Sequence, residues 1–142
     1  MSHFLTFVFV GSHVDDPARR AEEMMMPYFH GGGAYNSGNA MTKCDGFVIG
    51  GRYDQELFGV EPMYNLTPAQ FEERYGFEVV KEENNTRLAS EVPKQLIPYA
   101  IVTPEGNCAD CESKAQSEWE SEVRDVLQRY GEFYVVAINC HC

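Results

Sequence analysis

Residues 3–10 read HFLTFVFV, and this run constrains the fold more than any other part of the chain. In an extended backbone its apolar side chains point to both faces of a strand, and its β-branched and aromatic residues favour that backbone. A strand that is apolar on both faces is stable when both faces are covered and other strands lie beside it. The run therefore predicts a central strand of a sheet.

Helix and strand signals elsewhere predict an alternating order of elements. Asp15 or Asp16 can cap a helix near its start, and Pro27 marks the end of that helix. The last helix opens with a capping-box pattern in which Ser113 is the N-cap. The remaining predicted elements are strands at residues 47–53, 97–103 and 133–142, and helices at residues 67–76 and 113–131.

The resulting order is β-α-β, an insertion with a helix at residues 54–93, and then β-α-β. This order matches the split β-α-β, or ferredoxin-like, plan. We therefore predict an α+β fold with a ferredoxin-like sheet of about four strands and helices on one face, in a single domain over residues 1–142. An open α/β sheet with another strand order is the alternative, and an uncovered sheet edge leaves room for a homodimer.

The chain has 22 acidic and 11 basic residues, which gives a net charge of −11. Nucleic-acid backbones and anionic membranes attract clustered Lys and Arg, so direct binding to either is not expected. An acidic surface can instead complement a basic partner protein, although the charge can also serve solubility alone. Without a membrane-length apolar run or a signal-peptide pattern, we expect a cytoplasmic protein with reduced thiols.

The sequence IGGR at residues 49–52 is a candidate binding site. Glycines beside a strand let another group approach the backbone closely, and the Arg52 guanidinium can hold a carboxylate or phosphate through two hydrogen bonds. The alternative is that Arg52 forms a structural ion pair at a bulge. No nucleophile–base–orienter set or Walker lysine accompanies this motif, so a non-enzymatic role is favoured. The candidate binding residues are Arg52, Gly50, Gly51 and Asp45.

Four cysteines form a candidate metal site. Cys108 and Cys111 follow the third predicted strand, and Cys140 and Cys142 end the fourth. A β-α-β crossover would make these strands parallel, so their carboxyl ends would lie at one edge and the four sulfurs could converge. Four thiolates suit a structural zinc ion. A redox pair and thiols without a metal are the alternatives, because the C-x2-C-x28-C-x-C spacing matches no common zinc ribbon.

Three short segments, KCDGFVIGGRYDQEL, PYAIVTPEG and the terminal NCHC, resemble a family found in bacteriophage and actinobacterial genomes. The matching positions are Lys43, Asp45, Ile49, Gly50, Gly51, Arg52, Tyr53, Tyr99, Ala100, Val102, Thr103, Pro104, Gly106, Cys140 and His141. Cys44 and Gly46 stand where the family usually has aromatic residues, and the candidate zinc ligands other than Cys140 are not family features. The family has no established activity. The resemblance implies a phage or mobile-element origin and an important motif around Arg52.

Two classes of function follow from these observations. The first is a phage-type protein that acts by binding a protein of the bacterial host or of its defence complex, as an anti-CRISPR inhibitor does. The acidic composition, the absence of a catalytic constellation and the glycine-rich loop at residues 30–46 favour this class. The second is a small enzyme or ligand-binding protein that uses Arg52 and this loop. A zinc-stabilised structural or regulatory phage protein is a further alternative.

Overall fold

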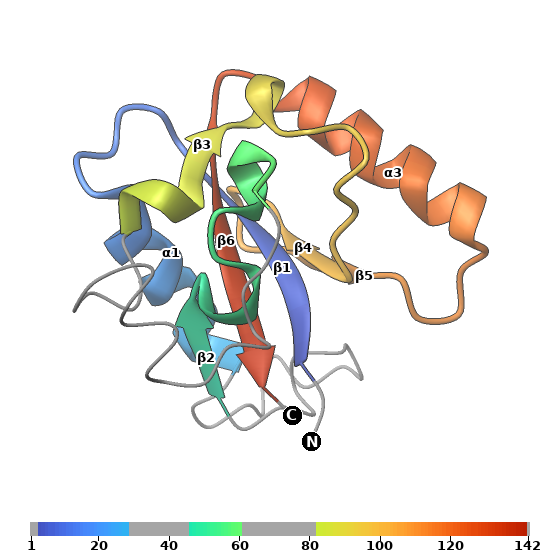
Figure 1. Cartoon of the computed structure of the whole chain (residues 1–142), viewed down its shortest axis with the longest axis horizontal. Coiled ribbons are helices and arrows are strands. Elements are labelled where there is room, and N and C mark those ends of the chain that lie inside the picture. Colours follow the sequence, from blue (N-terminus) through green and yellow to red (C-terminus); the bar gives the residue numbers. More distant parts are fainter. Residues whose placement is uncertain (1–2, 29–45, 61–81, 142) are drawn as a thin grey trace.

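The computed structural model describes residues 3–28, 46–60 and 82–141, and it shows a mixed α+β fold built on one six-stranded sheet (Figure 1). The strand order is β2-β6-β1-β4-β5, and β3 also pairs with β6. The predicted helix at residues 67–76 lies outside the described residues, and the single domain over residues 1–142 stays a prediction. The elements are β1 (His3–Val10), α1 (Pro17–Met25), β2 (Gly46–Ile49), β3 (Thr86–Leu88), β4 (Ala100–Val102), β5 (Cys108–Asp110), α3 (Gln116–Arg129) and β6 (Tyr134–His141).

Strand β1 is the central strand that the sequence predicts. It pairs along its whole length with β6 in antiparallel register, from His3 opposite His141 to Val10 opposite Tyr134. On its other side it pairs with β4 in parallel. Residues 4–10 are all buried, and the predicted cover on both faces is confirmed.

The described helices α1 and α3 cover opposite faces of the sheet, so the prediction of helices on one face is wrong. On one face, Phe4 and Val8 of β1 pack in a cluster with Met25 of α1. On the other face, Phe7 packs in a second cluster with Trp119 of α3. The physical reason is the composition of β1, because alternate side chains on both of its faces are apolar and each set needs its own cover.

The ferredoxin-like plan is not confirmed, and the sheet has more strands than the four predicted. Strand β2 pairs with β6, while the short strand β5 occupies the position beside β4. Strands β3 and β5 have only three residues each, which is too short for a periodic sequence signal. Strand β2 ends at Ile49 because Gly50 and Gly51 have positive φ angles and turn the chain.

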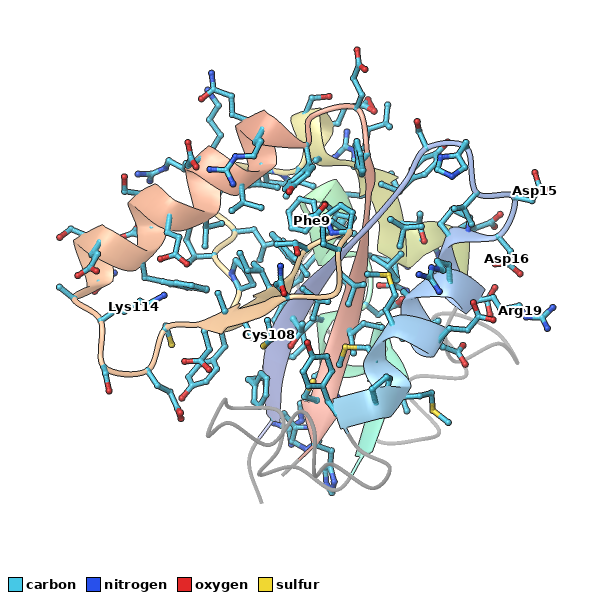
Figure 2. The ribbon with its side chains drawn as sticks, turned by 180° about the vertical axis from the view of Figure 1, so that it is seen from behind. Phe9, Asp15, Asp16, Arg19, Cys108 and Lys114 are labelled. Carbon is cyan, nitrogen blue, oxygen red and sulfur yellow. The ribbon has the colours of Figure 1, made fainter. Side chains whose placement is uncertain are left out.

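Helices α1 and α3 begin in different ways. Asp16 caps α1 by accepting a hydrogen bond from the Arg19 backbone N–H at 3.2 Å, as the sequence predicts, and Figure 2 shows both residues at the first turn of this helix. The predicted Ser113 cap of the last helix is wrong, because Ser113 has a φ of +65° and α3 begins only at Gln116. Within the described ranges, no helix is long and apolar enough to cross a membrane.

Candidate functional site

The Gly50–Gly51 pair forms a turn after β2 that only glycine accommodates well. Gly50 has a φ of +71° and a ψ of −78°, and Gly51 has a φ of +53°. A Cβ atom on Gly50 would lie 2.6 Å from Asn85 Nδ2, and one on Gly51 would lie 2.7 Å from Asn139 Nδ2. A close approach to this backbone is therefore confirmed, and the approaching groups are side chains of the protein itself.

Asn85 ties this turn to the chain beyond it. Its side chain is fully buried, and its Nδ2 donates a hydrogen bond to Asp54 Oδ1 at 2.7 Å. Its Oδ1 accepts a hydrogen bond from the Gln55 backbone N–H at 3.2 Å. Burial raises the pKa of Asp54, and the hydrogen bond from Asn85 partly opposes this rise. One amide side chain thus fixes two consecutive residues of the turn.

The next residues form a short 3-10 turn, Glu56–Phe58, that is anchored on both sides of Glu56. Before it, Gln55 has a φ of +67°, an uncommon conformation for a residue other than glycine. After Glu56, Leu57 is fully buried, and its carbonyl oxygen accepts a hydrogen bond from Arg87 Nη1 at 2.9 Å. Because both neighbours are held, the direction of the Glu56 side chain is set by the fold.

Glu56 lines a pocket of about 530 Å³ on the α3 side of the sheet. Tyr53 belongs to the same wall, Leu5 lies on β1, Ile97 precedes β4, and Trp119 extends from α3. Trp119 is held in place because its Nε1 donates a hydrogen bond to the Pro98 carbonyl oxygen at 2.7 Å. A concave space with mainly apolar walls and a few polar groups is the usual form of a ligand site.

The Glu56 carboxyl is the unusual group of this pocket. Its Oε2 is shielded from solvent and has no hydrogen-bond partner among the described residues. Burial raises the pKa of Glu56 above its ordinary value. A buried polar atom without a partner is costly, and such groups in native proteins require an explanation such as an absent ligand, ion or water.

Acidic residues bias the electrostatic potential at the pocket. The Tyr99 hydroxyl donates a hydrogen bond to Glu112 Oε2 at 2.9 Å, and burial together with Glu112 raises the pKa of Tyr99 to about 12. Burial and the charge of Asp110 raise the pKa of Cys111. Both side chains line the pocket. Because their pKa values are raised, they are protonated and uncharged at neutral pH.

Two basic residues, Lys114 and His3, also line the pocket. Lys114 is paired with a carboxylate, and His3 is mainly neutral at pH 7. The Nζ of Lys114, which lies just before α3 in Figure 2, donates hydrogen bonds to the Glu122 carboxylate at 2.9 and 3.1 Å. Burial, followed by the charge of Arg52, lowers the pKa of His3, so this imidazole is mainly neutral at pH 7. Its Nδ1 lies 3.2 Å from Asn139 Oδ1.

Ligand binding by the predicted residues stays a prediction. Gly50 and Gly51 shape the turn that leads to Glu56, while Arg52 is exposed and does not line the Glu56 pocket. Asp45 lies outside the described residues. The sequence shows no signal for Glu56, because its position depends on the hydrogen bond that holds the preceding Gln55 to Asn85, 30 residues further along the chain.

The strand arrangement from which a zinc site was expected is wrong. Strand β4 is parallel to β1 and β6 is antiparallel to it, so β4 and β6 run in opposite directions. Cys140 and Cys108 pack on the α1 face, whereas Cys111 packs on the α3 face. Among the described residues, no group of three or more His, Cys, Asp or Glu side chains could hold a metal ion. Cys142 lies outside them, so zinc bound by the four cysteines stays a prediction.

We expect the buried Cys140 and the half-buried Cys108 to be unreactive. Burial raises the pKa of Cys140 to about 12, and burial, Asp110 and Cys140 raise that of Cys108 to about 12. Since the thiolate is the reactive form, alkylation at pH 8 should be at least about 100-fold slower in the folded than in the unfolded protein. Peptide mass spectrometry after iodoacetamide treatment measures this. Burial predicts the same rates with and without a chelator, and faster labelling after chelation would indicate metal protection instead.

No family model, curated protein or solved structure matches the chain. The resemblance to the phage family therefore stays a prediction. The function has to be inferred from the contacts, burial and charges of the residues that surround the Glu56 pocket.

Proposed function

We propose that the protein acts by binding a positively charged partner protein at an acidic edge beside the Glu56 pocket. The acidic edge consists of Glu105, Asp110 and Glu112, which lie on and around β5. Strand β5 is the last strand of the sheet on this side, and residues 103–113 contain no Lys or Arg. This concentration of negative charge at a sheet edge is the observation that carries the proposal.

The acidic edge borders the pocket directly. Glu112 accepts a hydrogen bond from Tyr99, which lines the pocket, and Cys111 between the two acidic residues lines it as well. The nearest lysine in sequence, Lys114, is paired with Glu122 at 2.9 Å. Clustered charge of one sign attracts a partner of the opposite sign and sets its orientation.

A host protein is the partner class that the sequence favours. The resemblance to phage and actinobacterial proteins supports a phage-type role in the cytoplasm of a bacterial host. A basic nucleic-acid-binding surface of a defence complex has the complementary charge, and covering it would inhibit that complex in the manner of an anti-CRISPR protein.

Binding is favoured over catalysis by the chemistry of the pocket. The nucleophilic candidates there, Cys111 and Tyr99, have raised pKa values, whereas a catalytic nucleophile needs a lowered pKa or an adjacent base. The alternative of a ligand-binding protein is favoured by the pocket itself, with Glu56 rather than Arg52 as the binding residue.

The proposal is tested by removing the charge of the acidic edge. The test variant carries Glu105→Gln, Asp110→Asn and Glu112→Gln. The immobilised protein is incubated with lysate of a bacterial host, and bound proteins are quantified by mass spectrometry over a series of salt concentrations. We expect the wild type to retain basic host proteins in a salt-sensitive manner, and the variant to lose them by about tenfold or more.

A matched control removes the same charge from the other side of the sheet. It carries Asp15→Asn, Glu22→Gln and Glu23→Gln, three exposed positions at or near α1. This variant should retain the partner as the wild type does. Equal retention by both variants, or equal loss in both, would overturn the acidic edge as the binding surface. Restored phage plating on a defence-carrying host that expresses the protein tests the inhibitory role separately.

A further inference from the structure

We infer that the Glu56 pocket binds an organic cation, namely an ammonium or guanidinium group at the end of an aliphatic chain. A lysine or arginine side chain of the basic partner carries such a group, so the inference deepens the proposed function. It rests on that function for the natural source of the group. The capacity of the pocket for the cation rests on the pocket alone.

The first step is the unmet hydrogen-bonding capacity of Glu56. Its Oε2 is shielded from solvent and has no partner within the described part of the chain, and the residue lines an open pocket. The terminal torsion of a glutamate side chain is soft, so the carboxylate can turn about it to meet a ligand while the rest of the side chain keeps its direction. A ligand that donates hydrogen bonds would satisfy this group, and a charged donor forms the stronger bond.

The second step is the position of Glu56 on a braced turn. Asn85 holds Gln55 on one side, and Arg87 holds the carbonyl of the buried Leu57 on the other. The turn also includes the uncommon positive φ of Gln55. Conformations of this kind persist where the surrounding structure holds them, and they concentrate at binding sites. The carboxyl is thus prepared for a ligand before the ligand arrives.

The third step is the sign of the charge around the pocket. Burial and the negative charges of Asp110 and Glu112 raise the pKa values of Cys111 and Tyr99, which line the pocket. The ammonium group of Lys114 is occupied by Glu122. The charge of Arg52 also acts on the wall, at His3, whereas the carboxylates of Glu56, Asp110 and Glu112 favour an incoming cation.

The fourth step is the shape and character of the walls. Leu96, Ile97 and Pro98 form an apolar stretch that lines the pocket together with Tyr53 and Trp119. The stems of lysine and arginine side chains pack along apolar surface while the charged group reaches a polar partner. An aliphatic chain that ends in a cation therefore fits both the walls and Glu56.

The single tryptophan of the chain provides the test, because Trp119 lines the pocket. Titration with n-pentylammonium should give a saturable change in Trp119 fluorescence. Titration with n-pentanol, which has the same chain and no charge, should give a change at least about tenfold weaker in apparent affinity. Equal affinity for the alcohol would overturn the inference, because the pocket would then be only an apolar cavity.

Two glutamate variants locate the effect. Glu56→Gln keeps the size of the side chain and removes its charge, and it should weaken n-pentylammonium binding by about tenfold or more. Glu132→Gln changes an exposed glutamate outside the pocket and should bind as the wild type does. Thermal unfolding of both variants confirms that they are folded. Unchanged binding in a folded Glu56→Gln protein would contradict the assignment.

A last comparison distinguishes the sources of the cation. Tighter binding of Nα-acetyl-lysine amide or Nα-acetyl-arginine amide than of spermidine supports a partner side chain. Tighter binding of spermidine supports a free amine and would overturn the link to the partner, while the pocket assignment would stand. If the acidic-edge variant loses host proteins but the pocket binds no cation, the further inference fails and the proposed function survives.

Discussion

Replacing Gly50 by alanine is expected to lower the free energy of unfolding by roughly 3 kcal/mol or more. The φ of +71° and ψ of −78° at this position form a backbone that a side chain strains. In addition, the new methyl group would lie 2.6 Å from the buried Asn85 amide, which cannot move without losing its bonds to Asp54 and Gln55. Chemical denaturation followed by circular dichroism measures the loss.

Gly59→Ala is the matched control for this substitution. Gly59 also has a positive φ, of +78°, but nothing lies within 4 Å of a Cβ atom placed there. We expect this variant to lose only about 1 kcal/mol, which is the backbone cost alone. Equal losses for the two variants would show that the contact with Asn85 has no energetic role.

Replacing Asn85 by alanine is the other change with a large expected effect, a loss of about 2–4 kcal/mol at pH 7. The substitution leaves the buried Asp54 carboxyl without its donor and the Gln55 N–H without its acceptor. Asn107→Ala, at an exposed turn position, is the control and should change stability by less than about 0.5 kcal/mol.

The loss in Asn85→Ala should depend on pH through Asp54. The Asn85 hydrogen bond favours the charged carboxylate, so its removal raises the pKa of Asp54 further above its ordinary value. Wild type and variant then differ most above the pKa of Asp54 in the variant, and the difference shrinks as acid protonates the group. Unfolding measured from pH 7 to pH 4 should show this convergence, and a constant difference would contradict it.

The sequence predicts those features that depend on neighbouring residues. The apolar run of β1 requires cover on both faces wherever its partners come from, and Asp16 caps α1 through a residue three positions away. The close approach of side chains to Gly50 and Gly51 can also be predicted, since glycines beside a strand mark a bulge, a bend or a close approach to the backbone.

Features set by distant pairing could not be predicted. Strand β2 can lie beside β4 or β6 with the same local pattern, and only the complete sheet decides the choice. The site has the same limitation. Glu56 is distinguished by burial and by neighbours that Asn85 and Arg87 hold, and these lie about thirty residues away in sequence. No local motif marks such a glutamate.

The central claim is that Glu56, whose Oε2 is shielded from solvent and has no partner among the described residues, lines a pocket for an organic cation. Carbon-detected NMR of the side-chain carboxyl, assigned with Glu56→Gln, measures its pKa directly. We predict a pKa above the ordinary value of 4.5 in the free protein and a lower one with saturating n-pentylammonium, because the cation favours the carboxylate. A pKa at or below 4.5 that the amine does not change would contradict the account.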